Sequence, residues 1–183
     1  MMDDQTRPAA AGAGFTLVEV LFALAIVTTA ALSLAGVLGQ GIQIMRASQA
    51  QMIATEKATE AIESVFTARD TRILTWTGIH NVAGATGADG GIFLDGLQPL
   101  RSPGPDGLVN TADDGPIEEL VLPGPDNLLG TADDERVPLV DYTREIEIRD
   151  LGPNLRRVSV TVRYRVGAGT RDHVLVTYIS SYA

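Results

Sequence analysis

The side chains best able to do chemistry are the carboxylates and amides of a repeated segment in the middle third of the chain. Residues 103–114 (PGPDGLVNTADD) recur as residues 123–134 (PGPDNLLGTADD), with a period of 20 residues. Calcium typically takes about six to eight oxygen ligands from carboxylates, amides and backbone carbonyls. The repeat therefore predicts calcium binding, with candidate ligands Asp106, Asn110, Asp113, Asp114, Asp126, Asp133 and Asp134.

A second interpretation of the repeat needs no metal. Its spacing is not that of an EF-hand loop, and Gly130 stands in the second copy where the first has Asn110. The Pro-Asp steps favour turns, and Thr111 and Thr131 are placed to cap those turns locally. Two solvated surface turns and a calcium site are both compatible with the sequence.

A single carboxylate, Glu19, lies at the start of a long apolar run. A charged side chain in a membrane helix costs about 2.5 kcal/mol or more near the bilayer centre and less toward the interface. Such a residue is a functional candidate by default. The alternative is that Glu19 only stabilises the N-terminus of its own helix, but that effect is worth under about 1 kcal/mol.

The composition excludes several classes of function. Without cysteine, the chain has no disulfide, thiolate nucleophile or cysteine-ligated metal. A net charge of −9 argues against nucleic acid as a partner, because phosphate binding requires a basic surface. Only two histidines occur, and no nucleophile–base pair, phosphate-binding loop or metal triad is visible. We therefore expect that the protein is not an enzyme.

The element that positions Glu19 is an uncharged run of twenty residues, 20–39. At about 1.5 Å per residue, this run forms roughly 30 Å of helix, which matches the hydrocarbon core of a bilayer. Ten of the twenty residues are Leu, Ile, Val or Phe, and they contribute about −3 to −6 kcal/mol to insertion. A buried core helix is disfavoured, because no other segment of the chain could surround it.

The order of segments also distinguishes this N-terminus from a secretory signal peptide. In a signal peptide, the small-residue cleavage site follows the apolar region. Here the small residues 9–14 precede the apolar run. Cleavage at that point would leave the apolar helix on the mature protein.

The junction Gly14-Phe15-Thr16-Leu17-Val18-Glu19-Val20 resembles the processing site of type IV prepilins and type II secretion pseudopilins. The apolar sequence that follows looks most like minor pilins of the V type or the I-type minor pseudopilin. The resemblance covers roughly the first third of the chain. It implies that a prepilin peptidase cuts after Gly14 and methylates Phe15, and that Glu19 aligns subunits by pairing with a neighbour's amino terminus.

The same resemblance implies partners and a location. The partners would be prepilin peptidase, other pilins or pseudopilins, the inner-membrane assembly platform and membrane lipid. The protein would span the bacterial inner membrane once before assembly and belong to a periplasmic or extracellular fibre afterwards. The predicted leader departs from the family pattern, because Asp3 and Asp4 accompany a single Arg7 where family leaders are usually basic.

A long helix is expected to follow the predicted leader, residues 1–14. Residues 15–39 form its transmembrane half. Residues 40–69 are rich in good helix formers and make an amphipathic half. Within that half, one face collects apolar residues at spacings of three and four, namely Ala58, Ala61, Ile62 and Val65.

The remaining chain divides into two parts. Residues 70–138 are predicted to be a loop-rich acidic region that contains the repeat. Residues 139–183 hold three segments of alternating apolar and polar residues separated by turn signals, a pattern typical of an antiparallel β-meander. The predicted fold class is therefore α+β, with the long helix packed on a small antiparallel sheet, as the pilin resemblance also implies.

These observations together predict a structural subunit of a type IV pilus or a type II secretion pseudopilus. The alternative is a membrane-anchored, calcium-dependent adhesin or binding module that uses the acidic loops. A pilus and a secretion pseudopilus use the same first helix, so the sequence does not distinguish them. Apart from calcium, no cofactor is expected.

Overall fold

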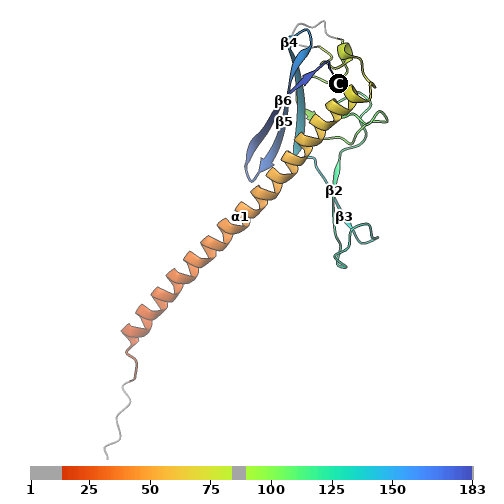
Figure 1. The fold of residues 1–183 in the computed structure, drawn as a ribbon. Coiled ribbons are helices and arrows are strands. Elements are labelled where there is room, and N and C mark those ends of the chain that lie inside the picture. The colour runs from red at the N-terminus through yellow and green to blue at the C-terminus, as the bar shows by residue number, and fades with distance from the viewer. Residues whose placement is uncertain (1–13, 84–89, 183) are drawn as a thin grey trace, which may run out of the picture. The chain divides into compact units, whose positions relative to one another are not determined.

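A computed structural model describes residues 14–83 and 90–182 of the 183-residue chain. The described part consists of a long N-terminal helix followed by antiparallel strands, so the fold is α+β (Figure 1). The chain divides into two compact units, unit 1 (Met1–Ile44) and unit 2 (Met45–Ala183), and each is described by itself. Of the predicted leader, Gly14 lies inside the described residues and the rest lies outside them.

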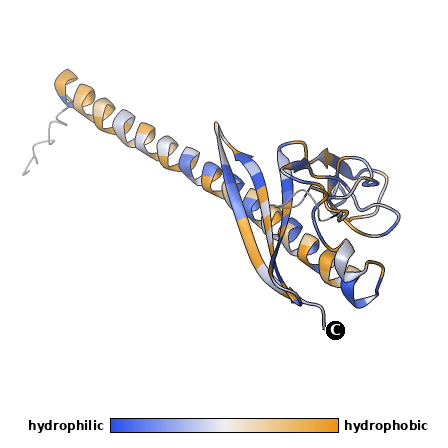
Figure 2. Cartoon of the chain, turned by 90° about the horizontal axis from the view of Figure 1, so that it is seen from above, coloured by the Kyte–Doolittle hydropathy of each residue, from blue (hydrophilic) through white to orange (hydrophobic). Residues whose placement is uncertain are grey.

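Unit 1 is formed by the first part of helix α1, which runs Leu17–Asp70. All described residues of this unit are exposed, and apolar residues predominate at the start of the helix (Figure 2). This apolar stretch is long enough and apolar enough to cross a membrane. The helix continues through Gly36, Gly39 and Gly41 without interruption.

Unit 2 contains the remainder of α1 and a four-stranded antiparallel sheet in the order β1-β4-β5-β6. Strands β4, β5 and β6 span Tyr142–Gly152, Leu155–Val166 and Gly169–Ser180. They follow one another as the predicted meander, and all three extend beyond the segments that show clear alternation. Strand β1 (Gln98–Pro99) was not predicted, and it pairs with the start of β4.

The core of unit 2 lies between α1 and the inner face of the sheet. From the helix, Ala54, Ala58, Ala61 and Val65 are fully buried. Their small side chains let the helix approach the sheet closely. In the same cluster they meet the inward-facing residues of β4 and β5, namely Ile146, Ile148, Val158, Val160, Val162 and Tyr164. The predicted helix face is therefore confirmed, except that Ile62 is half-buried.

The region predicted as loop, residues 70–138, contains more structure than expected. A 3-10 helix, η1, spans Trp76–Gly78, and strands β2 (Glu119–Leu122) and β3 (Glu135–Pro138) form a second antiparallel sheet. The second repeat, residues 123–134, joins β2 to β3. The first repeat is closed in a similar way by an antiparallel bridge between Arg101 and Ile117. Both copies are therefore hairpin loops.

Candidate functional site

The N-terminal junction begins with a capped helix. The hydroxyl of Thr16 accepts a hydrogen bond from the backbone N–H of Glu19 at 3.3 Å, and the Thr16 carbonyl accepts one from Val20 at 3.2 Å. Thr16 is therefore the N-cap, and Glu19 is the third residue of the helix, which is the spacing of a capping box. The Thr-x-x-Glu pattern in the sequence was a signal for this cap.

Glu19 lies on an apolar helix face. A shallow groove along that face is lined by Phe15, Glu19, Val20, Ala23, Leu24 and Val27. The Glu19 side chain is the charged member of this set, and it is exposed. Phe15, the residue that would begin a cleaved chain, precedes the Thr16 cap and lines the same groove as Glu19.

Hydroxyl groups in the apolar stretch are satisfied within the helix. Thr28 donates to the carbonyl of Leu24 at 2.7 Å, and Ser33 donates to that of Thr29 at 2.8 Å. A polar group in hydrocarbon costs several kcal/mol when it lacks a partner. These bonds make the hydroxyls compatible with lipid, and Glu19 is then the polar side chain of the N-terminal stretch that calls for an external partner.

The two acidic repeats adopt the same local structure. In the first copy, the Thr111 hydroxyl donates to Asp113 and to Asp114, both at 2.8 Å. The Asp106 side chain accepts from the Leu108 N–H at 2.9 Å. The second copy repeats the hydroxyl bonds, from Thr131 to Asp133 and Asp134, and the turn bond from Leu128 to Asp126.

The two copies differ at three positions, and at two of these the backbone is left-handed in both copies. Gly107 and its equivalent Asn127 have φ of 75° and 57°, and Asn110 and its equivalent Gly130 have φ of 65° and 88°. Glycine and asparagine are the residues that adopt this conformation most readily. Exchanging one for the other therefore conserves the loop, and Gly130 is explained by backbone geometry without reference to ligands.

The aspartates proposed as calcium ligands accept hydrogen bonds from groups of their own loops. Local capping by Thr111 and Thr131 is confirmed, and the Thr131 hydroxyl holds the pKa of Asp133 below its ordinary value. Within residues 14–83 and 90–182, no group of three or more histidine, aspartate or glutamate side chains is arranged to hold a metal ion. Calcium binding thus stays a prediction that this geometry does not support.

The two copies of the loop differ in how far their apolar pair is buried. In the first copy, Leu108 and Val109 are 1% and 0% exposed. Their equivalents in the second copy, Leu128 and Leu129, are 61% and 66% exposed. The same local structure is therefore part of the core in one place and projects its apolar pair into solvent in the other.

This difference gives a matched prediction for stability. Replacing Leu108 by alanine is expected to lower the free energy of unfolding by about 2–4 kcal/mol, because a cavity forms in the core. The equivalent Leu128→Ala is expected to change it by less than about 0.5 kcal/mol. Urea unfolding of the full chain in detergent, followed by the fluorescence of the single tryptophan, measures both. Equal effects would contradict the different burial of the two loops.

A buried charge network, which the sequence reasoning missed, supports the first loop. Arg144 is fully buried, and its Nε lies 3.5 Å from the Asn110 side-chain oxygen. Its Nη1 lies 4.0 Å from Glu118, which also pairs with Lys57 of the helix. The sequence did contain a signal that Arg144 would be buried. Arg144 precedes Ile146 by two residues and so belongs to the inner face of β4.

Burial and pairing oppose each other in this network. For Glu118, burial is the larger effect and raises the pKa, although Lys57 opposes it. For Lys57, burial alone would lower the pKa, but hydrogen bonds to Glu118 and Glu60 outweigh it and raise the pKa. Burial therefore sets the direction for Glu118, whose side chain is 9% exposed, whereas pairing sets it for Lys57, whose side chain is 17% exposed. The network therefore ties α1 to the segment before β2.

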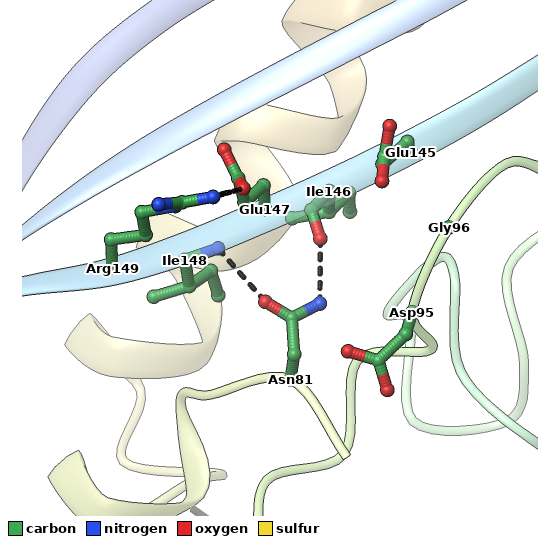
Figure 3. Close-up of a pocket in the computed structure, with 8 residues that line it drawn as sticks. All are labelled: Asn81, Asp95, Gly96, Glu145, Ile146, Glu147, Ile148 and Arg149. Carbon is green, nitrogen blue, oxygen red and sulfur yellow. Dashed lines mark hydrogen bonds and ion pairs between the residues drawn. The ribbon is translucent and has the colours of Figure 1, made fainter. Parts of the chain in front are cut away.

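A small pocket beside β4 is a structural feature rather than a ligand site (Figure 3). The Asn81 side chain donates to the Ile146 carbonyl at 2.7 Å and accepts from the Ile148 N–H at 2.8 Å. It thereby replaces a strand partner where β1 no longer covers β4. The remaining space is about 190 Å³, below the roughly 300 Å³ at which small-molecule pockets begin.

A second polar cluster joins the end of β4 to η1. Asp150 accepts from Arg156 at 2.7 Å and contacts His80 at 3.1 Å. Arg156 also covers the ring of Trp76, with its guanidinium carbon 4.0 Å from the ring centroid. Partial burial opposes ionisation of Asp150, but the hydrogen bonds from Arg156 and His80 outweigh it and lower its pKa.

The lowered pKa of Asp150 predicts a pH-dependent effect. Its stabilising contribution is complete above the unfolded pKa of about 3.9 and is lost as the pH falls through the lower folded value. Asp150→Asn is expected to cost about 1 kcal/mol at neutral pH, a small figure because the carboxylate is half-exposed. The gap between variant and wild type should close in acid, as followed by Trp76 fluorescence during urea unfolding. A gap that persists unchanged would contradict this role.

Comparison with known proteins adds no relatives. No family model, no curated protein and no solved structure matches the chain. Function is therefore argued from the residues of the junction, the helix and unit 2.

Proposed function

We propose that the protein is a membrane-anchored structural subunit, a minor pilin or pseudopilin, of a type IV pilus or type II secretion pseudopilus. The observation that carries the proposal is Glu19, an exposed acid in the first turn of a capped apolar helix. Gly14 and Phe15 immediately precede that helix. In this proposal, a prepilin peptidase removes residues 1–14, and the helix remains as anchor and assembly element.

Cleavage would supply the partner that Glu19 needs. The nitrogen of Phe15 is a neutral amide in the intact chain and becomes a cationic amine after the cut. At about 4 Å and an effective dielectric constant near 20, an amine and a carboxylate attract by about 4 kcal/mol before desolvation costs. Pairing between Glu19 of one subunit and the amine of its neighbour would therefore favour assembly of cleaved chains over uncleaved ones.

Membrane anchoring can be tested apart from assembly. Val27→Arg places a charge in the middle of the apolar stretch and is expected to cost about 3–4 kcal/mol of insertion energy, a large share of what the stretch contributes. Val140→Arg is the control, because Val140 in unit 2 is as exposed as Val27, at 66% against 64%. In density-gradient flotation of cell membranes, wild type and Val140→Arg should float, whereas Val27→Arg should be depleted. A wild-type chain that does not float would contradict the anchor.

A further inference from the structure

The loop between β2 and β3 presents an apolar pair within an acidic surround. Leu128 and Leu129 are 61% and 66% exposed, although the equivalent pair in the first repeat is buried. Residues 123–138 carry four acidic side chains and one basic one, namely Asp126, Asp133, Asp134, Glu135 and Arg136. The exposed leucines therefore lie on a hairpin of strongly negative charge.

The outer face of β5 and β6 has the opposite character. Strand β6 is at the edge of the sheet, and its outward-facing Val174, Val176 and Tyr178 are 53%, 47% and 58% exposed. Directly opposite them on β5 lie Thr161, Ser159 and Arg157. This face of the two strands carries three arginines and one acidic residue, namely Arg157, Arg163, Arg165 and Asp172.

Two of these arginines are weakly engaged within the chain. Arg157 lies 3.7 Å from Glu147, and its buried Nε has no hydrogen-bond partner among the described residues. Arg165 lies 3.7 Å from Asp141. Exposed ion pairs of this length contribute little, at most about 1 kcal/mol. Arg157 and Arg165 can therefore bind carboxylates of another molecule at little cost. They lie toward opposite ends of the apolar stripe formed by Val174, Val176 and Tyr178.

The hairpin and this face do not meet within one molecule. Both belong to unit 2, and the β2–β3 hairpin lies on the opposite side of α1 from β5 and β6 (Figure 1). Two complementary surfaces on different sides of one subunit produce a head-to-tail contact, which repeats from copy to copy. A second copy of this chain is the occupant that both surfaces match.

We propose that the β2–β3 loop of one molecule docks on the outer face of β5 and β6 of a second copy. Leu128 and Leu129 cover the stripe Val174, Val176 and Tyr178, and the carboxylates of the loop face Arg157 and Arg165. This contact joins unit 2 of one molecule to unit 2 of the other, and it does not depend on cleavage after Gly14 or on Glu19.

A loop contact of this kind is too small to hold two copies together in dilute solution. Stable complexes bury about 1,200 Å² or more, which two leucines and their neighbours do not supply. Molecules anchored in one membrane have a high effective concentration, and a weak contact then becomes occupied. The experiment therefore uses the full chain in liposomes.

The absence of cysteine makes disulfide trapping a direct test. Leu129→Cys and Val176→Cys variants are mixed in liposomes of neutral lipid and oxidised mildly. The mixture is expected to give several times more cross-linked dimer than either variant alone. Leu129→Cys mixed with Leu151→Cys is the control, because Leu151 is 55% exposed and lies outside the proposed contact. Equal yields in the two mixtures, or a yield dominated by like-with-like dimers, would overturn the proposal.

Charge provides the second readout. Adding Arg157→Gln to the Val176→Cys chain is expected to lower the mixed yield by up to about fivefold. Raising salt from about 0.05 M to about 0.5 M should have a similar effect, because the Debye length shortens. A yield that responds to neither change would mean that the acidic loop does not recognise the basic face.

Discussion

Replacing Gly14 by leucine should leave residues 1–14 attached to nearly every molecule, whereas nearly every wild-type molecule should lose them. The structure separates this effect from misfolding. A Cβ at Gly14 meets no atom within 4 Å, and the position precedes the Thr16 cap that starts the helix. The fold therefore accepts a side chain at Gly14. The loss of cleavage should arise because the peptidase no longer recognises the residue before the scissile bond.

The matched control is Gly36→Leu. Gly36 also has no atom within 4 Å of an added Cβ, and it lies within the apolar helix, away from the junction. The mass of each purified chain, taken from cells that contain prepilin peptidase, shows whether the leader is present. Shortening of Gly14→Leu to the wild-type product would place the scissile bond elsewhere.

Glu19→Ala should leave processing intact and reduce incorporation into the fibre by tenfold or more. The amine released at Phe15 would lose its carboxylate partner, which provides about 4 kcal/mol of attraction before desolvation. If Glu19 acted only on its own helix dipole, the loss would be under about 1 kcal/mol. The Thr16 cap remains in this variant, because its hydroxyl accepts from the backbone of residue 19.

Glu56→Ala controls for loss of a carboxylate on the same helix, since Glu56 is an exposed residue of the unit 2 part of α1. The amount of each variant in sheared fibres, relative to the amount in membranes, measures incorporation. Normal incorporation of Glu19→Ala would refute the counter-ion role, even if processing at Gly14 proved correct.

Long periodic elements were predictable from the sequence, and short ones were not. The apolar run, the buried face at Ala58, Ala61 and Val65, and the alternation of β5 repeat over many residues, so a few exceptions do not obscure them. Strand β1 has two residues and β2 four. Such strands exist because distant partners pair with them, which local pattern cannot reveal.

The acidic repeat shows how composition can mislead. Its aspartates have the right chemistry for calcium, yet they accept hydrogen bonds from the N–H and hydroxyl groups of their own turns. Gly130 occupies the position equivalent to Asn110, and if only possible metal-ligand atoms are considered, the second copy has lost a ligand there. The positive φ at both positions shows that backbone conformation is what they share.

Which copy of the repeat is buried could not be predicted from the sequence. Leu108 and Leu128 occupy equivalent positions in nearly identical segments. One is buried because the first loop packs into unit 2, where its Asn110 meets the buried Arg144. No feature of the second segment indicates that its leucine stays exposed, because the difference arises from what surrounds each loop.

In the proposed function, an apolar helix stays on the protein after the polar residues ahead of it have been removed. The most direct test is the mass of the native subunit purified from membranes, together with the mass of its N-terminal peptide. The proposed function predicts a chain that begins at Phe15 and carries a methyl group on its amine. A native chain that begins at Met1, or one that lacks residues 15–39, would contradict it.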